Sequence, residues 1–184
     1  LRVGEGLEWL RLRGLDGDGR PTIPGRALDL LFSAVPPPRG ERCGRPVCRW
    51  LNATYGLTHA HSQLDELTHE MLDEAFGVAN LAGLRHLGLV NRRRRAVSGA
   101  GYDVYLPHVE RLSMPILFLH GARNPILRPI GTKATVAWIN WLHGSGTATY
   151  LELPGYSHLD AMIGRAAAAD VFPSIVAHLD VTNA

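Results

Sequence analysis

The fold prediction for this chain depends on one segment, Pro115-Ile116-Leu117-Phe118-Leu119-His120-Gly121. An uninterrupted apolar run of this length that ends at glycine is typical of a strand buried on both faces of a parallel sheet. The spacing of apolar residues predicts a helix over Thr132–Leu142, a second strand over Thr147–Leu153 and a final helix over Arg165–Leu179. Strand, helix, strand and helix joined by short connections predict an α/β fold with parallel strands.

The residues before this unit divide into two further parts. Residues 1–40 are rich in Gly, Pro and Arg, carry the turn signal Asp16-Gly17-Asp18-Gly19, and are expected to form an irregular lead-in. Residues 41–112 are expected to form a mainly helical, cap-like segment. Its clearest helical signal is an apolar stripe at three- and four-residue spacings, formed by Leu64, Leu67, Met71, Leu72 and Ala75. Residues 113–184 then form the strand–helix–strand–helix core.

Composition excludes several classes of protein. The 184 residues are 46% hydrophobic, which suffices for one packed domain. The formal net charge is only +2, and the one basic run, Arg92–Arg95, contains no aromatic residue, so we expect no nucleic-acid partner. No apolar run is long enough to span a membrane or to serve as a signal peptide, which predicts a cytoplasmic protein without a membrane span.

The two cysteines, Cys43 and Cys48, do not make a disulfide framework. A local bridge between them stays open for an oxidising compartment. No second Cys/His pair follows at the spacing of zinc ligands, so the sequence predicts no metal site. We likewise expect no cofactor to bind to these residues.

The loops that follow the two predicted strands carry the candidate catalytic residues. The carboxyl ends of parallel strands meet at one edge of a sheet, and functional groups gather there. The first loop contains Asn124 and the second contains His158. Imidazole is suited to proton transfer because its ordinary pKa lies near neutrality, and a residue behind the ring fixes its tautomer. Their roles are implied by a family resemblance, which makes His158 the candidate base and Asn124 the candidate orienting residue.

These loops resemble the C-terminal part of the α/β-hydrolase superfamily, in His120-Gly121-x-x-Asn124 and Gly155-x-x-His158. The resemblance implies that Asn124 replaces the usual acid. In the serine-protease template an Asp-to-Asn change costs ~10⁴ in turnover. The chain contains no G-x-S-x-G nucleophile elbow, and none of its seven serines follows a predicted strand in that context. We therefore expect a fragment of a longer protein whose N-terminal half supplies the nucleophile.

A closer resemblance is to the hydrolase-like module of cholesterol-oxidase-like GMC oxidoreductases, over roughly residues 41–180. It is carried by Glu41-Arg42-Cys43, Val47-Cys48-Arg49, Tyr55-Gly56, Thr68-His69, Phe76-Gly77, Gly101-Tyr102-Asp103, Tyr105-Leu106, His120-Gly121-Ala122, Asn124, Pro154-Gly155-Tyr156, His158-Leu159-Asp160, Gly164, Asp170-Val171 and Pro173. This resemblance implies that asparagine is a common occupant of the acid position. Any FAD would bind elsewhere in such a protein.

Three functions remain open at this point. The first is an esterase- or lipase-like hydrolase fragment of lipid or sterol metabolism, inactive alone and completed by the remainder of its own chain. The second is a non-catalytic accessory module of a flavin oxidoreductase. The third is a degenerate remnant that folds poorly because half a parallel sheet exposes an apolar edge. For the first two, Tyr156 and the cap-like segment are expected to line a pocket for an apolar ester or sterol-like molecule.

Overall fold

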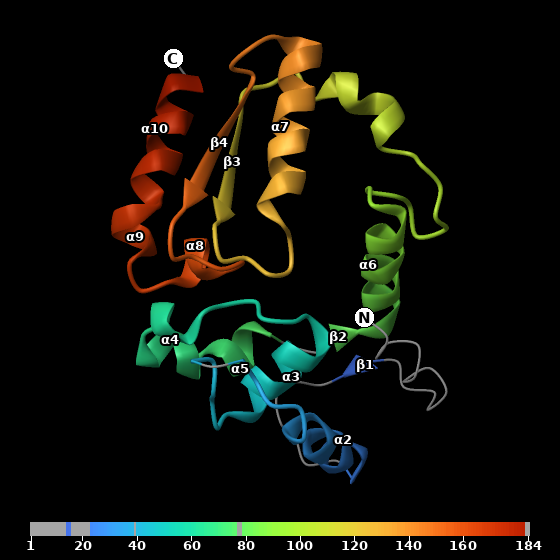
Figure 1. Cartoon of the computed structure of the whole chain (residues 1–184), viewed down its shortest axis with the longest axis vertical. Coiled ribbons are helices and arrows are strands. Elements are labelled where there is room, and N and C mark those ends of the chain that lie inside the picture. Colours follow the sequence, from blue (N-terminus) through green and yellow to red (C-terminus); the bar gives the residue numbers. More distant parts are fainter. Residues whose placement is uncertain (1–13, 16–22, 39, 77–78, 183–184) are drawn as a thin grey trace. The chain divides into compact units, whose positions relative to one another are not determined.

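The computed structural model describes residues 14–15, 23–38, 40–76 and 79–182 (Figure 1). The chain divides into two compact units. The first comprises Leu1–Gly56 and His69–Pro107, and the second comprises Leu57–Thr68 and His108–Ala184. Residues 57–68, which fall within the predicted cap-like segment, cluster with the second unit. The predicted turn at Asp16–Gly19 lies outside the described residues.

The first unit is built mainly from helices. Its core joins Phe32, Trp50, Leu81 and Leu84, and the rings of Phe32 and Trp50 meet edge to face with centroids 5.1 Å apart. Its elements are α2 (Ile23–Ser33), α3 (Pro46–Thr54), α5 (Leu72–Ala75), α6 (Leu81–Arg93) and the antiparallel pair β1 (Gly14–Leu15) and β2 (Ala79–Asn80).

Residues suited to helix ends stand where α3 and α6 begin and end. Pro46 occupies the first turn of α3, where its missing N–H costs nothing. The Asn80 side chain accepts a hydrogen bond from Ala82 N at 2.8 Å and caps α6. Arg94 ends α6 in the left-handed conformation, so Arg92 and Arg93 lie in the last turn of this helix and Arg94 at its cap.

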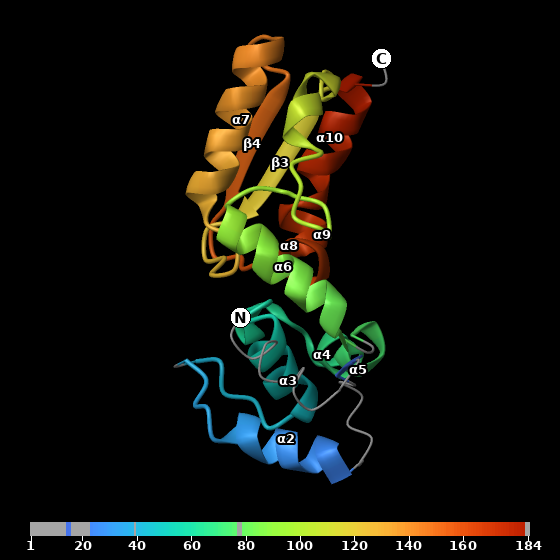
Figure 2. The ribbon, with the colours of Figure 1, turned by 90° about the vertical axis from the view of Figure 1, so that its right-hand side faces the viewer.

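The second unit contains a parallel pair of strands between helices. Strands β3 (Ile116–Gly121) and β4 (Ala148–Leu153) pair in register from Ile116↔Ala148 to Gly121↔Leu153. In both views the pair lies between α7 (Pro129–His143) on one side and α10 (Phe172–Thr182) on the other (Figures 1 and 2). Two short helices, α8 (Asp160–Ile163) and α9 (Ala167–Asp170), precede α10. The hydrophobic core of this unit includes Leu153, Tyr156, Ala167 and Val171.

The predicted fold class, the C-terminal part of an α/β-hydrolase, is wrong. Among the described residues the parallel sheet has only two strands, and the chain is mostly helical. The run that predicted a doubly buried strand is only half-buried from Ile116 to Leu119. The physical reason is that strand–helix–strand patterning specifies one parallel pair and its connection. It carries no information on whether further strands flank that pair.

The predicted single helix over the 64–75 stripe is also broken. This stretch consists of α4 (Glu66–Glu70) and α5, and the short 3₁₀ helix η1 (His61–Gln63) precedes it. Leu64 and Leu72 are buried, whereas Leu67 and Met71 are exposed. The Asp65 carboxylate accepts a hydrogen bond from Thr68 N at 2.6 Å. This side-chain hydrogen bond marks the start of α4 as a separate helix. In the part of the chain that the structure describes, no helix is long and apolar enough to cross a membrane.

Candidate functional site

The loops that follow β3 and β4 pack against each other in the second unit. Because the strands are parallel, both loops leave the sheet at the same edge. Arg123 N donates to Tyr156 O at 2.9 Å, and Ala122 N donates to Leu153 O at 3.0 Å. These two backbone hydrogen bonds hold the loop carrying Asn124 against the loop carrying His158.

Gly121 makes this close packing possible. A Cβ atom at this position would overlap the carbonyl oxygens of Tyr156 and Ser157. Backbone atoms of a packed loop cannot move aside as a flexible side chain would. The glycine that ends β3 is therefore required by the approach of the second loop.

Asn124 and His158 are in direct contact. The Nδ2 atom of Asn124 lies 3.1 Å from Nδ1 of His158. The orientation of the Asn124 amide is fixed from its other side, since Oδ1 accepts hydrogen bonds from Ile126 N and Leu127 N, both at 3.0 Å. Turning the amide over would place its NH₂ group against two backbone N–H donors. The amide must therefore present its NH₂ group to His158.

This orientation determines the tautomer of His158. An NH₂ group only donates, so Nδ1 of the imidazole must accept and carries no proton. The proton of the neutral ring is then on Nε2. In a catalytic triad the carboxylate instead accepts from Nδ1–H, which leaves Nε2 free to take a proton. The observed contact therefore gives His158 an Nε2–H donor where a general base needs an acceptor.

The surroundings of His158 favour its neutral form. Burial lowers the pKa of the imidazole below its ordinary value of 6.5. His120 acts in the same direction, while the Asp160 carboxylate partly opposes both. At neutral pH the ring is thus an uncharged hydrogen-bond donor that remains partly exposed.

The Asp160 carboxylate holds the His158 loop in place through hydrogen bonds. Its carboxylate is fully buried and accepts hydrogen bonds from Ser157 N at 2.7 Å and Ala60 N at 3.1 Å. Leu159 N also donates to Thr58 O at 2.8 Å. Asp160 begins α8, and its carboxylate also joins this loop to Ala60, which is distant in sequence.

Tyr156 is a buried residue of the second unit's core. Its side chain is 4% exposed, and its hydroxyl donates to Asp170 at 2.8 Å. Burial raises the pKa of the Tyr156 hydroxyl to about 12, and the hydrogen bond to Asp170 adds to this effect. The ring thus packs within the protein, and its predicted role in binding a substrate stays a prediction.

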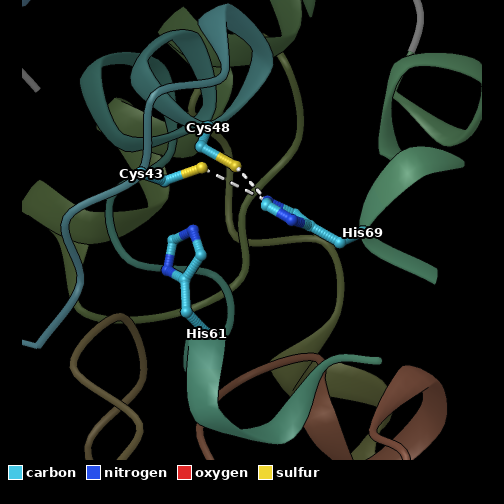
Figure 3. A group of neighbouring side chains, drawn as sticks. All are labelled: Cys43, Cys48, His61 and His69. Carbon is cyan, nitrogen blue, oxygen red and sulfur yellow. Dashed lines mark hydrogen bonds between the residues drawn. The ribbon is translucent and has the colours of Figure 1, made fainter. Parts of the chain in front are cut away.

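A second group of chemically active side chains lies in the first unit. The Sγ atoms of Cys43 and Cys48 lie 3.3 and 3.2 Å from Nε2 of His69 (Figure 3). Sequence patterns did not predict this cluster, because 20 positions separate Cys48 from His69. The signal present in the sequence was the Cys43-x₄-Cys48 spacing, which falls within the usual range for zinc-ligating cysteines. The two histidines downstream, His61 and His69, are spaced more widely than a usual zinc-ligating pair.

Comparisons with family models, with curated proteins and with solved structures found no match for this chain. The two sites must therefore be interpreted from their own chemistry.

Proposed function

We propose that this chain is a non-catalytic binding module for a small apolar molecule that carries a carbonyl oxygen, such as an ester or a sterol ketone. In this proposal His158 donates its Nε2–H to that oxygen. The observation that carries the proposal is the contact between Asn124 Nδ2 and His158 Nδ1 at 3.1 Å. A neutral ring whose proton is held on Nε2 is suited to binding an acceptor, and a partly exposed position leaves that donor available.

Exposed apolar side chains on the loop after β3 and on α8 support an apolar ligand. Leu127 and Met162 are 56% and 61% exposed. Leu127 N donates to Asn124 Oδ1, and Met162 N donates to the carbonyl oxygen of Leu159, the residue that follows His158. Small-molecule sites usually combine apolar side chains with a few fixed polar groups.

Ester hydrolysis by a longer protein containing this chain is the second candidate. It is favoured by the placement of Asn124 and His158 after two neighbouring parallel strands. It requires the opposite tautomer of His158 and a nucleophile that this chain does not provide in a G-x-S-x-G context. The accessory role in a flavin oxidoreductase agrees with the first proposal.

We also propose a cytoplasmic location. Cys43 and Cys48 are not joined by a disulfide in the structure. Reduced cysteines persist in compartments where glutathione and thioredoxin are maintained.

The test compares ligand binding with catalysis. p-Nitrophenyl butyrate and cholest-4-en-3-one are titrated into the protein, and the NMR signals of His158 are followed. We expect binding without ester turnover, loss of binding in His158→Ala, and retained binding in His158→Gln, whose side-chain amide keeps a donor near the Nε2 position. His178→Ala is the control. Ester turnover by the native chain that disappears in His158→Ala would overturn the proposal.

A further inference from the structure

Two sulfur atoms and one nitrogen converge in the first unit in a way that hydrogen bonding alone does not explain. Both Cys43 Sγ and Cys48 Sγ lie within 3.3 Å of the same atom, His69 Nε2. An imidazole nitrogen has one lone pair or one N–H, so it forms one strong hydrogen bond at a time. A site for a cation that both sulfurs and the nitrogen share accounts for all three positions.

The distances agree with tetrahedral zinc. Zn–S bonds of about 2.3 Å and Zn–N bonds of about 2.0–2.1 Å place sulfur and nitrogen ligands roughly 3.6 Å apart at the tetrahedral angle. The observed sulfur–nitrogen separations are 3.3 and 3.2 Å, and the three donor atoms lie within 4.8 Å of one another. Small side-chain rotations therefore suffice to close the three ligands around an ion.

Positive charge and N–H donors lie close to both sulfur atoms. Cys48 lies in the first turn of α3, where the helix dipole stabilises negative charge. Arg45 N donates to Cys43 Sγ at 3.4 Å. The Arg49 guanidinium donates to Gly44 O at 2.9 Å, which places its charge beside the segment that joins the two cysteines. These groups stabilise the negative charge that sulfur carries as a zinc ligand.

We propose that Cys43, Cys48 and His69 bind a zinc ion that stabilises the first unit. The ion would join the loop before α3 and the start of α3 to the end of α4, across the 20 residues that separate Cys48 from His69. This replaces the sequence-based expectation of no metal. The proposal does not depend on the function proposed for His158.

These three ligands leave one position of a tetrahedral zinc site, which a water molecule or a further side chain of this chain would fill.

The experiment measures the metal in the whole chain, expressed without a histidine tag and purified under reducing conditions. We expect one equivalent of zinc by mass spectrometry. Replacement by Co²⁺ should give the intense visible bands of a tetrahedral site and a thiolate-to-cobalt charge-transfer band. Both signals should disappear in Cys43→Ser, Cys48→Ser and His69→Ala. His86→Gln is the matched control, since its amide can still donate to Val97 O, the present partner of His86 at 2.7 Å.

A second measurement does not rely on variants that fold. In the native protein, both thiols should be protected from Ellman's reagent by zinc and should react after a chelator is added. Loss of the cobalt bands in His86→Gln to the same extent as in His69→Ala would contradict the ligand assignment. A reduced protein that takes up neither zinc nor cobalt, or a purified protein with a Cys43–Cys48 disulfide and no metal, would overturn the proposal.

Discussion

Asn124→Asp is the substitution that tests the His158 site most selectively. One oxygen of the new carboxylate keeps the hydrogen bonds from Ile126 N and Leu127 N, and the other replaces Nδ2 beside His158 Nδ1. Opposite unit charges about 4 Å apart interact by about 4 kcal/mol at an effective dielectric constant of about 20. Because His158 is partly exposed, solvent reduces this energy. We expect the proton-binding constant of His158 to rise by about 10- to 100-fold, or about 1.4–2.7 kcal/mol.

The substitution also reverses the sign of a pH effect on stability. In the native chain the pKa of His158 is lowered on folding, so the unfolded chain binds the proton first. The free energy of unfolding therefore falls as the pH drops below about 6.5. In Asn124→Asp the folded pKa lies above the unfolded value. Its contribution is then fully present below about pH 6.5 and is lost as the pH rises through the folded pKa.

The assay is an NMR titration of the His158 Cε1–H signal, combined with urea unfolding between pH 5.5 and 8.5. Asn91→Asp is the control, because it makes the same charge change at an exposed position of α6 in the other unit. The native pKa of His158 should be below 6.5 and should rise only in Asn124→Asp. An equal change in both variants, or none in Asn124→Asp, would refute the contact on which the site is built.

Three further substitutions test the packing that supports the site. Gly121→Ala should destabilise the chain by about 1–3 kcal/mol, because its Cβ overlaps the carbonyls of the second loop; a Tm equal to that of the native protein would contradict this. Asp160→Asn should cost about 1–3 kcal/mol in urea unfolding, since an NH₂ group then faces a backbone donor, and unchanged stability would show that the anchor is dispensable. Ile139→Ala should cost about 2–5 kcal/mol, because this α7 side chain is fully buried; a loss below 1 kcal/mol would show that the α7 contact is loose.

The sequence located the elements of the second unit but not the extent of its sheet. Strands β3 and β4 and helix α7 form at the segments that their apolar spacing predicts. That spacing reports which side of an element is buried, and it does not report what lies beside the element. The strand residues Ile116 to Leu119 illustrate this limit of apolar spacing. Their apolar run predicted a strand buried on both faces of a larger sheet, but they are only half-buried.

At the two sites, too, the sequence predicted some features and missed others. Asn124 and His158 were expected to lie at one edge because both follow parallel strands, and the structure brings them together. The direction of the Asn124 amide depends on Ile126 N and Leu127 N, and no sequence pattern encodes it. Likewise, the approach of His69 to the two thiols depends on the path of 20 intervening residues, which spacing alone does not give.

The contact with Asn124 places the proton of neutral His158 on Nε2. A two-bond ¹H–¹⁵N correlation spectrum of the uniformly labelled protein at neutral pH distinguishes the two neutral tautomers directly. The contact with Asn124 predicts the pattern of a protonated Nε2 and an unprotonated Nδ1, and assignment is checked by loss of the signals in His158→Gln. A pattern with the proton on Nδ1 would contradict the account and would restore His158 as a candidate general base.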